Sequence, residues 1–339
     1  MKLVTFQPRT ESSAQPRIGA LLDDGQHIVD LAAAWHAQQR SSSPHFTDML
    51  ALLDAGSEAM DHARKLLAWA ETERPADALH AADAVRLLAP LPRPRSIRDC
   101  MSFERHVAHC IRAVARHKAP PLAAADRWCE RVMGRGFLWP PKTWHRQPTY
   151  YKGNPHSVVG PEAEIRWPRY TRRLDYELEF GIVIGRGGCN LTAREARSHI
   201  AGAMIFNDFS ARDIQGREMA FRLGPAKGKD FDTGNALGPW LVTLDELPDL
   251  QHLAMAARIN GEQWSTGNSR DMRWSFDELL AYISQDETLH PGEFIGSGCV
   301  PDGCGLELDR WLRPGDVVEL EVERLGTLRN RIATTEPGT

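Results

Sequence analysis

The stretch RRLDYELEFGIVIG, residues 172–185, places three carboxylates at alternate positions directly before an apolar run. Side chains alternate between the two faces of a strand, so a strand here would direct Asp175, Glu177 and Glu179 to one face. Like charges on one face repel, and a buried carboxylate without a partner costs several kcal/mol. The pattern therefore predicts either a solvated edge strand or a face that binds a positive group, such as a hard divalent cation.

The composition is that of an ordinary globular protein. The chain has 339 residues, of which 42% are hydrophobic and 25% charged, and a formal net charge of -4, so it is long enough for one large domain or two smaller ones. The charge balance gives no electrostatic footprint for nucleic acid, and no apolar run is long enough to span a membrane. The six cysteines are too few for a disulfide scaffold, and the first residues lack the apolar core of a signal peptide. We therefore expect a cytoplasmic protein with reduced thiols that binds neither nucleic acid nor membrane.

A proline-rich segment predicts a boundary between two domains. Residues 1–90 carry short strand patterns followed by helical patterns around 30–39 and 46–73, which indicates a small N-terminal β-rich domain. Pro90, Pro92 and Pro94 then interrupt regular structure. Residues 91–339 contain many strand patterns, few long helices and no strand-helix alternation. The sequence thus predicts an α+β fold that is mostly β.

The larger domain begins with a helical pattern over 102–118 and a segment over 119–148 that we expect to be irregular. This segment contains Trp128, Trp139 and Trp144, and we expect a lid or insertion at about 104–147. Farther along, Thr192 and Glu195 form a capping-box pattern for a short helix. Strand patterns dominate the remainder, with tight-turn chemistry at positions 260–261.

Other candidate functional residues occur in three separate stretches. Asp208 ends an apolar strand pattern, Asp99 follows the proline-rich segment, and His106 lies seven positions later. Taken singly, each has an ordinary structural explanation, such as a helix cap or a structural histidine. The glycine-rich loop around Lys229 lacks the Gly-Lys-Ser/Thr ending of a phosphate-binding loop, and no dinucleotide fingerprint is present, which argues against nucleotide binding.

Together the stretches resemble the fumarylacetoacetate hydrolase family, in the same order and spacing across most of residues 95–330. The matching stretches are RDCMSFERHV (98–107), YYKGNPHSVVGP (150–161), LDYELEFGIVIG (174–185), FNDFSARDIQ (206–215), LGPAKGKDFDTGNALGPW (223–240), GSGCVPDGCGLEL (296–308) and LRPGDVVELEVERLGTLRN (312–330). The resemblance implies a C-terminal catalytic domain of the family type, a mixed β-sandwich roll, over 91–339. It also implies a homodimer formed through that domain.

The resemblance further implies a divalent cation, Mg²⁺ or alternatively Mn²⁺ or Ca²⁺, bound by four carboxylates. The matching ligands are Asp99, Glu177, Glu179 and Asp208. Asp175 matches no ligand of the family, and we expect it to be a solvated neighbour. Thr233 falls where the family has a second, structural ion site.

The remaining family roles concern catalysis and substrate. His106 matches the general base, and Glu307, in a predicted Leu-Glu-Leu strand, matches the residue that orients it. Lys229, Arg212 and Gln215 match the polar groups that hold substrate oxygens, the last two in a predicted loop. Lys229 would also stabilise an enolate. Tyr151 and Cys299 match further substrate contacts.

Three positions depart from the family pattern: Met101 replaces a tyrosine, Cys299 replaces a threonine, and His109 replaces a glutamate found in some relatives. We expect Glu307 to supply the carboxylate missing at 109.

The leading hypothesis is a metal-dependent hydrolase that cleaves a C–C bond of a 1,3-diketo acid, such as fumarylacetoacetate or an acylpyruvate, in aromatic catabolism. The alternative keeps the metal site but changes the reaction to isomerisation or decarboxylation of a 2-oxo-diene dioate, or hydration of a 2-oxo-enoate. Stabilisation of an enolate serves all of these reactions. A non-catalytic relative is disfavoured because the full set of family residues is present.

Overall fold

The computed structural model describes residues 1–10, 15–134, 136–221 and 223–334. Within them the helices are α1 (Leu31–Gln39), α2 (Met49–Asp54), α3 (Gly56–Glu73), α4 (Glu104–Lys118), α5 (Pro120–Met133), α6 (Ala193–Ala196), α7 (Arg212–Glu218), α8 (Phe276–Ile283) and α9 (Gly305–Leu308). The strands are β1 (Lys2–Pro8), β2 (Arg17–Leu21), β3 (His27–Asp30), β4 (Leu79–Ala81), β5 (Val85–Leu88), β6 (Ile97–Cys100), β7 (Tyr150–Gly153), β8 (Val158–Val159), β9 (Glu164–Ile165), β10 (Leu174–Asp175), β11 (Leu178–Ile184), β12 (Ile200–Asp208), β13 (Ser210–Ala211), β14 (Asn235–Thr243), β15 (Ala254–Ile259), β16 (Glu262–Asn268), β17 (Phe294–Gly296), β18 (Val317–Val322) and β19 (Gly326–Ile332).

In the described part of the chain these strands form one large and two smaller sheets. The large sheet has the order β4-β3-β2-β1-β14-β12-β11-β17-β6-β7, with β5 paired to β1 and β8 to β14. Most neighbours are antiparallel, whereas β17–β6 and β14–β8 are parallel. The second sheet has the order β16-β15-β18-β19-β9, and its strands β18 and β19 contact β12 of the large sheet. The prediction of an α+β fold rich in mixed β-structure is confirmed.

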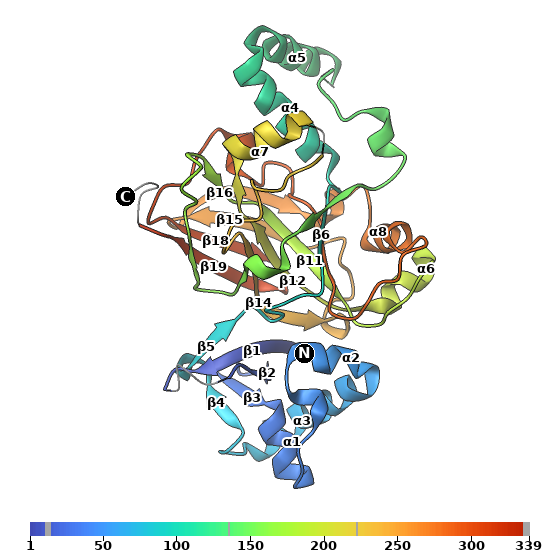
Figure 1. Cartoon of the computed structure of the whole chain (residues 1–339), viewed down its shortest axis with the longest axis vertical. Coiled ribbons are helices and arrows are strands. Elements are labelled where there is room, and N and C mark those ends of the chain that lie inside the picture. The colour runs from blue at the N-terminus through green and yellow to red at the C-terminus, as the bar shows by residue number, and fades with distance from the viewer. Residues whose placement is uncertain (11–14, 135, 222, 335–339) are drawn as a thin grey trace.

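Elements β1–β5 and α1–α3 form a lobe at one end of the molecule (Figure 1). The predicted helices around 30–39 and 46–73 are present as α1, α2 and α3. Strand β1 pairs with β14, so the lobe and the remainder share one sheet. They also share a hydrophobic cluster, in which Leu52 and Leu66 of the lobe are buried with Phe206 and Leu237.

Helices α4 and α5 lie at the opposite end of the molecule (Figure 1). The prediction that residues 119–148 are irregular is wrong for the first half of the segment, because Pro120–Met133 forms α5. Proline is favourable in the first turn of a helix, where its missing N–H has no intrahelical partner, and alanine and leucine follow it here. Trp128 on this helix is 63% exposed, whereas Trp144 farther along is buried.

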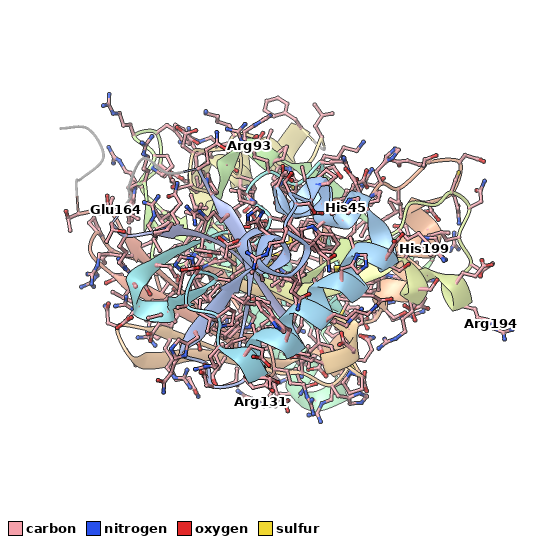
Figure 2. All side chains as sticks on the ribbon, turned by 90° about the horizontal axis from the view of Figure 1, so that it is seen from below. His45, Arg93, Arg131, Glu164, Arg194 and His199 are labelled. Carbon is pink, nitrogen blue, oxygen red and sulfur yellow. The ribbon has the colours of Figure 1, made fainter. Side chains whose placement is uncertain are left out.

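Many charged side chains lie on the outside of the molecule, whereas others are buried in the interior. Figure 2 shows Glu164 and Arg194, which are both exposed, at the rim of the view from the N-terminal lobe. Within the described residues no helix is both long and apolar enough to span a membrane.

Candidate active site

Three carboxylates from different strands of the large sheet meet at one place. Asp99 lies in β6, Glu179 in β11 and Asp208 at the end of β12, and one oxygen of each lies within 4.8 Å of the other two. All three side chains are buried. Gly296 of β17 pairs with Asp99, and a Cβ atom on this glycine would lie only 2.3 Å from Oδ1 of Asp99. Glycine at 296 is therefore what allows the Asp99 carboxylate to occupy this position.

The three carboxylates fit a hard divalent cation. Both oxygens of Glu179 and Oδ1 of Asp208 are buried without a hydrogen-bond partner among the described residues. Burial, together with the charges of the neighbouring carboxylates, raises the pKa of Glu179 well above its usual range, and burial and Asp208 raise the pKa of Asp99 to about 8. Unpaired buried carboxylates at this spacing repel one another, and a cation with a preference for oxygen ligands removes the repulsion.

Glu177 belongs to the same group of charges but is held by cations. Its Oε1 accepts a hydrogen bond from Nη2 of Arg212 at 2.8 Å, and its Oε2 accepts one from Nζ of Lys229. The same Nζ lies 2.5 Å from Oδ2 of Asp208. Burial acts to raise the pKa of Glu177, but Arg212 and Lys229 hold it below its usual range. The ligand role of Glu177 therefore remains a prediction, whereas the structure pairs it with the two expected substrate-binding cations.

The expectation that Asp175 is solvated is wrong. The side chain is fully buried, and its Oδ2 accepts a hydrogen bond from Nε of Arg212 at 2.7 Å. The backbone N–H groups of Gly305 and Leu306 donate to its two oxygens at 2.7 and 3.0 Å. The acidic stretch is also not one continuous strand, because β10 ends at Asp175 and β11 begins at Leu178. Asp175 thus positions Arg212 and the start of α9.

His106 and Glu307 form a buried pair. Nδ1 of His106, in the first turn of α4, lies 3.0 Å from Oε2 of Glu307. Burial acts to lower the pKa of His106, but the charge and hydrogen bond of Glu307, with smaller effects of Cys304 and Glu177, raise it to about 9. The prediction that Glu307 lies in a strand is wrong, since residues 305–308 form α9. The carboxylate nonetheless reaches the histidine, because α4 packs against α9.

The other predicted substrate contacts lie around the carboxylates. The hydroxyl of Tyr151 donates to Oδ2 of Asp208 at 2.5 Å, and Oε1 of Gln215 accepts from Nη1 of Arg212 at 2.9 Å. The prediction of a loop at Arg212 and Gln215 is wrong, because both residues lie in α7. Cys299 is buried and its thiol donates to the carbonyl of Val300.

Thr233 and Met101 occupy less enclosed positions. The Thr233 hydroxyl accepts a hydrogen bond from the backbone N–H of Arg166, so the structural-ion role at this position stays a prediction. Met101, which replaces a tyrosine, is 39% exposed.

Sequence patterns gave no role to Cys110, Asp302 or Cys304, and identified His109 only as a departure from the family pattern. Cys304 donates from Sγ to Oε2 of Glu307 at 3.2 Å, and Cys110 Sγ lies 3.6 Å from Nε2 of His106. Nδ1 of His109 lies 2.9 Å from Oδ1 of Asp302. The spacing of His106, His109 and Cys110 at i, i+3 and i+4 in a predicted helix could have indicated one shared face. Asp302 and Cys304, which lie just before α9, had no comparable local signal.

Comparisons with known proteins agree with this arrangement. The family model of the fumarylacetoacetate (FAA) hydrolase C-terminal domain matches residues 130–333. Human mitochondrial oxaloacetate tautomerase FAHD2B is 35% identical over 334 residues, which cover 98% of this chain and 91% of the relative. Oxaloacetate tautomerase YisK of Bacillus subtilis is 29% identical over 322 residues, which cover 93% of this chain and 95% of the relative. A solved structure of fumarylacetoacetate hydrolase from psychrophilic Exiguobacterium antarcticum superposes with a TM-score of 0.69 at 26% identity, covering 99% of this chain and all of that one.

The fold and the site define a mixed α+β enzyme with a carboxylate centre suited to a divalent cation. The chain belongs to the fumarylacetoacetate hydrolase family.

Proposed function

We propose that the protein is a divalent-cation-dependent tautomerase or isomerase that moves a proton to or from carbon in a 2-oxo dicarboxylate such as oxaloacetate. The observation that carries the proposal is the buried His106–Glu307 pair beside buried carboxylates that lack hydrogen-bond partners. His106 and Glu177 are close enough for each charge to shift the pKa of the other, so the pair belongs to the same site. The relatives described above that are named oxaloacetate tautomerases support this reaction, which is the alternative of the sequence-based hypotheses.

His106 is the group that would carry the proton. Glu307 holds the proton on Nδ1, so Nε2 is the ring atom that gives up and takes up the transferred proton. Because the pKa of His106 is raised to about 9, the ring is protonated near neutral pH, so Nε2 would deliver its proton to the carbon next to a carbonyl and take one back from another atom of the substrate. When bound by Asp99, Glu179 and Asp208, a divalent cation would supply charge stabilisation for the substrate oxygens.

Arg212 is a cation of the site with donors left for a substrate carboxylate, whereas the three donors of the Lys229 ammonium already contact Glu177 and Asp208. Arg212 uses its Nε, Nη1 and Nη2 atoms for Asp175, Gln215 and Glu177, which fixes the plane of the guanidinium group. An arginine has five N–H donors, so two remain for a bidentate or single contact with an anionic substrate. A fixed guanidinium loses little conformational entropy on binding, which favours an acid substrate with a second carboxylate over a neutral ketone.

Hydrolysis of a C–C bond is the second candidate, because a histidine held by a carboxylate also activates water. The two reactions differ in mass balance. Tautomerisation leaves the mass of the substrate unchanged, whereas hydrolysis adds one water and yields two acids. We therefore propose incubation of the full chain with Mg²⁺ and a panel of the oxaloacetate enol, fumarylacetoacetate and acylpyruvates, followed by mass spectrometry of the products. Loss of enol absorbance without new acids supports tautomerisation; formation of two acids from a diketo acid supports hydrolysis instead.

We also propose the homodimer that the family resemblance implies. Several large apolar side chains of the C-terminal part are exposed in the single chain, among them Trp128 and Met133 of α5 and Phe221 and Leu223 beyond α7. Contact with a second copy of the chain would remove such side chains from water. Light scattering at micromolar concentration should give twice the mass of the chain, and a monomer would contradict the proposal.

A further inference from the structure

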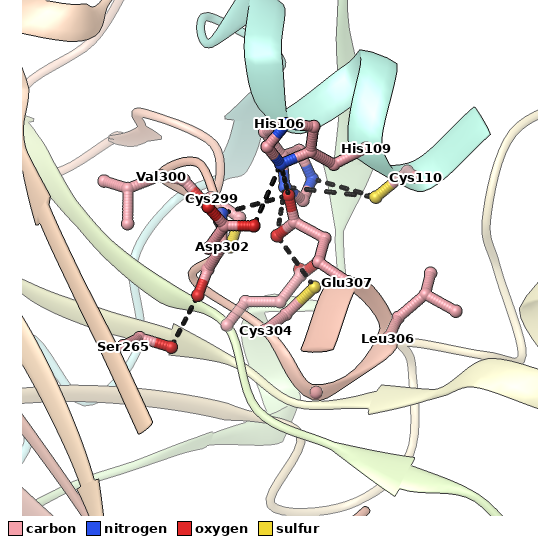
Figure 3. A network of polar contacts seen from close by, with 12 residues as sticks. His106, His109, Cys110, Ser265, Cys299, Val300, Asp302, Cys304, Leu306 and Glu307 are labelled. Atoms are coloured by element: carbon pink, nitrogen blue, oxygen red, sulfur yellow. Dashed lines mark hydrogen bonds and ion pairs between the residues drawn. The ribbon is translucent and has the colours of Figure 1, made fainter. Parts of the chain in front are cut away.

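A second cluster of metal-binding side chains lies beside the carboxylates and differs from them in chemistry. His106, Cys299, Cys304 and Glu307 each offer one ligand atom, and these atoms all lie within 4.8 Å of one another. All four residues are buried. Figure 3 shows them converging from helix α4, from the loop that follows β17 and from α9. Two sulfur atoms and an imidazole form a soft ligand set, whereas the neighbouring centre offers carboxylate oxygens alone.

We propose that this cluster is a binding site for Zn²⁺ or a similar borderline-soft cation, held by Cys299, Cys304, His106 and Glu307. Thiolate, imidazole and carboxylate are the ligands of tetrahedral zinc sites, in which neighbouring ligand atoms are roughly 3.3–3.8 Å apart. Two of the distances between ligand atoms in the cluster are already shorter than that range. Oε2 of Glu307 lies 3.0 Å from Nδ1 of His106 and 3.2 Å from Sγ of Cys304. The cation would replace the hydrogen atoms in these contacts, and the two thiol protons and the Nδ1 proton of His106 would pass to solvent.

The loop that carries the cysteines is held in place by its own turn. The N–H of Gly303 donates to the carbonyl of Val300 at 2.9 Å, and this turn lies between the two cysteines. A Cβ atom on Gly303 would lie 2.8 Å from Sγ of Cys299, so glycine at 303 leaves room for the thiol. Both sulfur atoms are therefore positioned by backbone geometry before any cation binds, which reduces the ordering needed for binding.

Outer contacts orient the ligands further. Oε1 of Glu307 accepts a hydrogen bond from the backbone N–H of Asp302 at 3.1 Å and lies 3.5 Å from Nδ1 of His109. Such contacts fix the carboxylate and leave its Oε2 directed at His106 and Cys304. Metal sites depend on contacts of this kind, because they set the direction of each ligand atom.

The zinc site shares His106 with the proposed proton transfer, so the two uses of the histidine exclude each other. Zn²⁺ at this site would therefore inhibit the enzyme even when the carboxylate centre holds Mg²⁺. This consequence rests on the proposed function, whereas binding of the cation does not.

The test uses Co²⁺, whose bonds to thiolate sulfur absorb in the near ultraviolet. The full-length protein is kept reduced with a phosphine, saturated with Mg²⁺ and titrated with Co²⁺. We expect a thiolate-to-cobalt charge-transfer band and strong visible bands of a tetrahedral site, both removed by one equivalent of Zn²⁺. The variants Cys299→Ala and Cys304→Ala should lose the charge-transfer intensity in part and the double variant entirely. Competition with a chromophoric chelator should show Zn²⁺ affinity at least about 10-fold weaker in each single variant.

Cys189→Ser is the matched control, because this cysteine is exposed and distant in the chain from the cluster. It should keep the bands and the Zn²⁺ affinity. Glu179→Gln, which removes a ligand of the carboxylate centre, should also keep them, so the zinc site can hold even if the proposed function fails. Absence of the charge-transfer band in the reduced wild-type protein overturns the proposal whatever the variants do. Retention of the band in the double variant overturns it as well.

Discussion

Nδ1 of His106 lies 3.0 Å from Oε2 of Glu307 although 201 positions separate the two residues in the chain. Helix α4 and the short helix α9 pack together and bring the pair into the interior. If His106 carries the proton, His106→Ala should lower kcat by about 10²–10⁴-fold. Glu307→Gln should lower it less, because the imidazole remains.

The two variants and their double variant should be measured over a pH series. Residues that act as a unit give losses that do not multiply, so the double variant should resemble His106→Ala. Glu307→Gln removes a negative charge that raises the pKa of His106, so the basic limb of its pH–rate profile should move to lower pH. Multiplicative losses, or a profile that stays in place, would show that the pair does not act together.

Glu179→Gln should separate metal binding from stability. Both Glu179 oxygens are buried without a hydrogen-bond partner among the described residues, next to two other carboxylates. Glutamine cannot ionise, so the variant avoids the cost of burying or protonating the Glu179 carboxyl group, and the metal-free variant should melt at a higher temperature than wild type while Mg²⁺ or Mn²⁺ binding falls strongly. Calorimetric titration and thermal unfolding with and without cation measure both effects. The exposed Glu164→Gln should change neither, and unchanged Mg²⁺ affinity in Glu179→Gln would contradict the metal assignment.

Lys229→Met should destabilise the metal-free protein. Nζ of Lys229 lies between the carboxylates of Glu177 and Asp208, and all three groups are buried. Loss of one partner from a buried ion pair costs about 3–5 kcal/mol because the remaining charge is unpaired. Denaturant unfolding should show a loss of that order, reduced by added Mg²⁺. Lys227→Met at an exposed position is the control, and a loss below about 1 kcal/mol in Lys229→Met would argue against a buried cation here.

The contact between His109 and Asp302 should make stability fall as the pH rises. The hydrogen bonds of Asp302 and Glu307, against the effect of burial, raise the pKa of His109 from 6.5 to about 9. A histidine whose pKa is raised by folding contributes its full free energy of stabilisation below pH 6.5. This contribution is lost as the pH rises through about 9. Melting temperatures of the metal-free protein should decline over this window, and Asp302→Asn should flatten the decline.

His106 titrates in the same range, so the difference between wild type and Asp302→Asn isolates the His109 contribution. His252→Gln, which removes an exposed histidine–aspartate pair, should leave the decline unchanged. Parallel profiles for wild type and Asp302→Asn would rule out the assignment.

Local signals in the sequence predicted local structure well. Thr192 and Glu195 form the expected capping box, and the Asn260-Gly261 turn joins β15 to β16 with positive φ at both residues. Both features depend on side chains a few positions apart, which a sequence displays directly. The sequence patterns do not predict α5, although proline is compatible with a helix start.

Long-range partners could not be predicted in the same way. Asp175 was expected in solvent, yet it is buried because Arg212, 37 positions later, and the backbone of α9 supply its hydrogen bonds. Similarly, the sequence spacing of Cys299 and Cys304 did not reveal that both thiols face His106. The family resemblance supplied the expected roles of the site residues, whereas only the three-dimensional structure supplied the pairs that each residue makes.

The central claim is proton transfer to carbon by His106, and solvent-isotope incorporation tests it most directly. Oxaloacetate, supplied as its enol in D₂O with Mg²⁺, is followed by NMR with wild type and His106→Ala. We predict that wild type speeds deuterium incorporation at the carbon between the two carbonyl groups, with the carbon skeleton intact, and that His106→Ala loses most of the acceleration. Incorporation no faster than without enzyme for every 2-oxo dicarboxylate tried, or equal acceleration by His106→Ala, would contradict the claim.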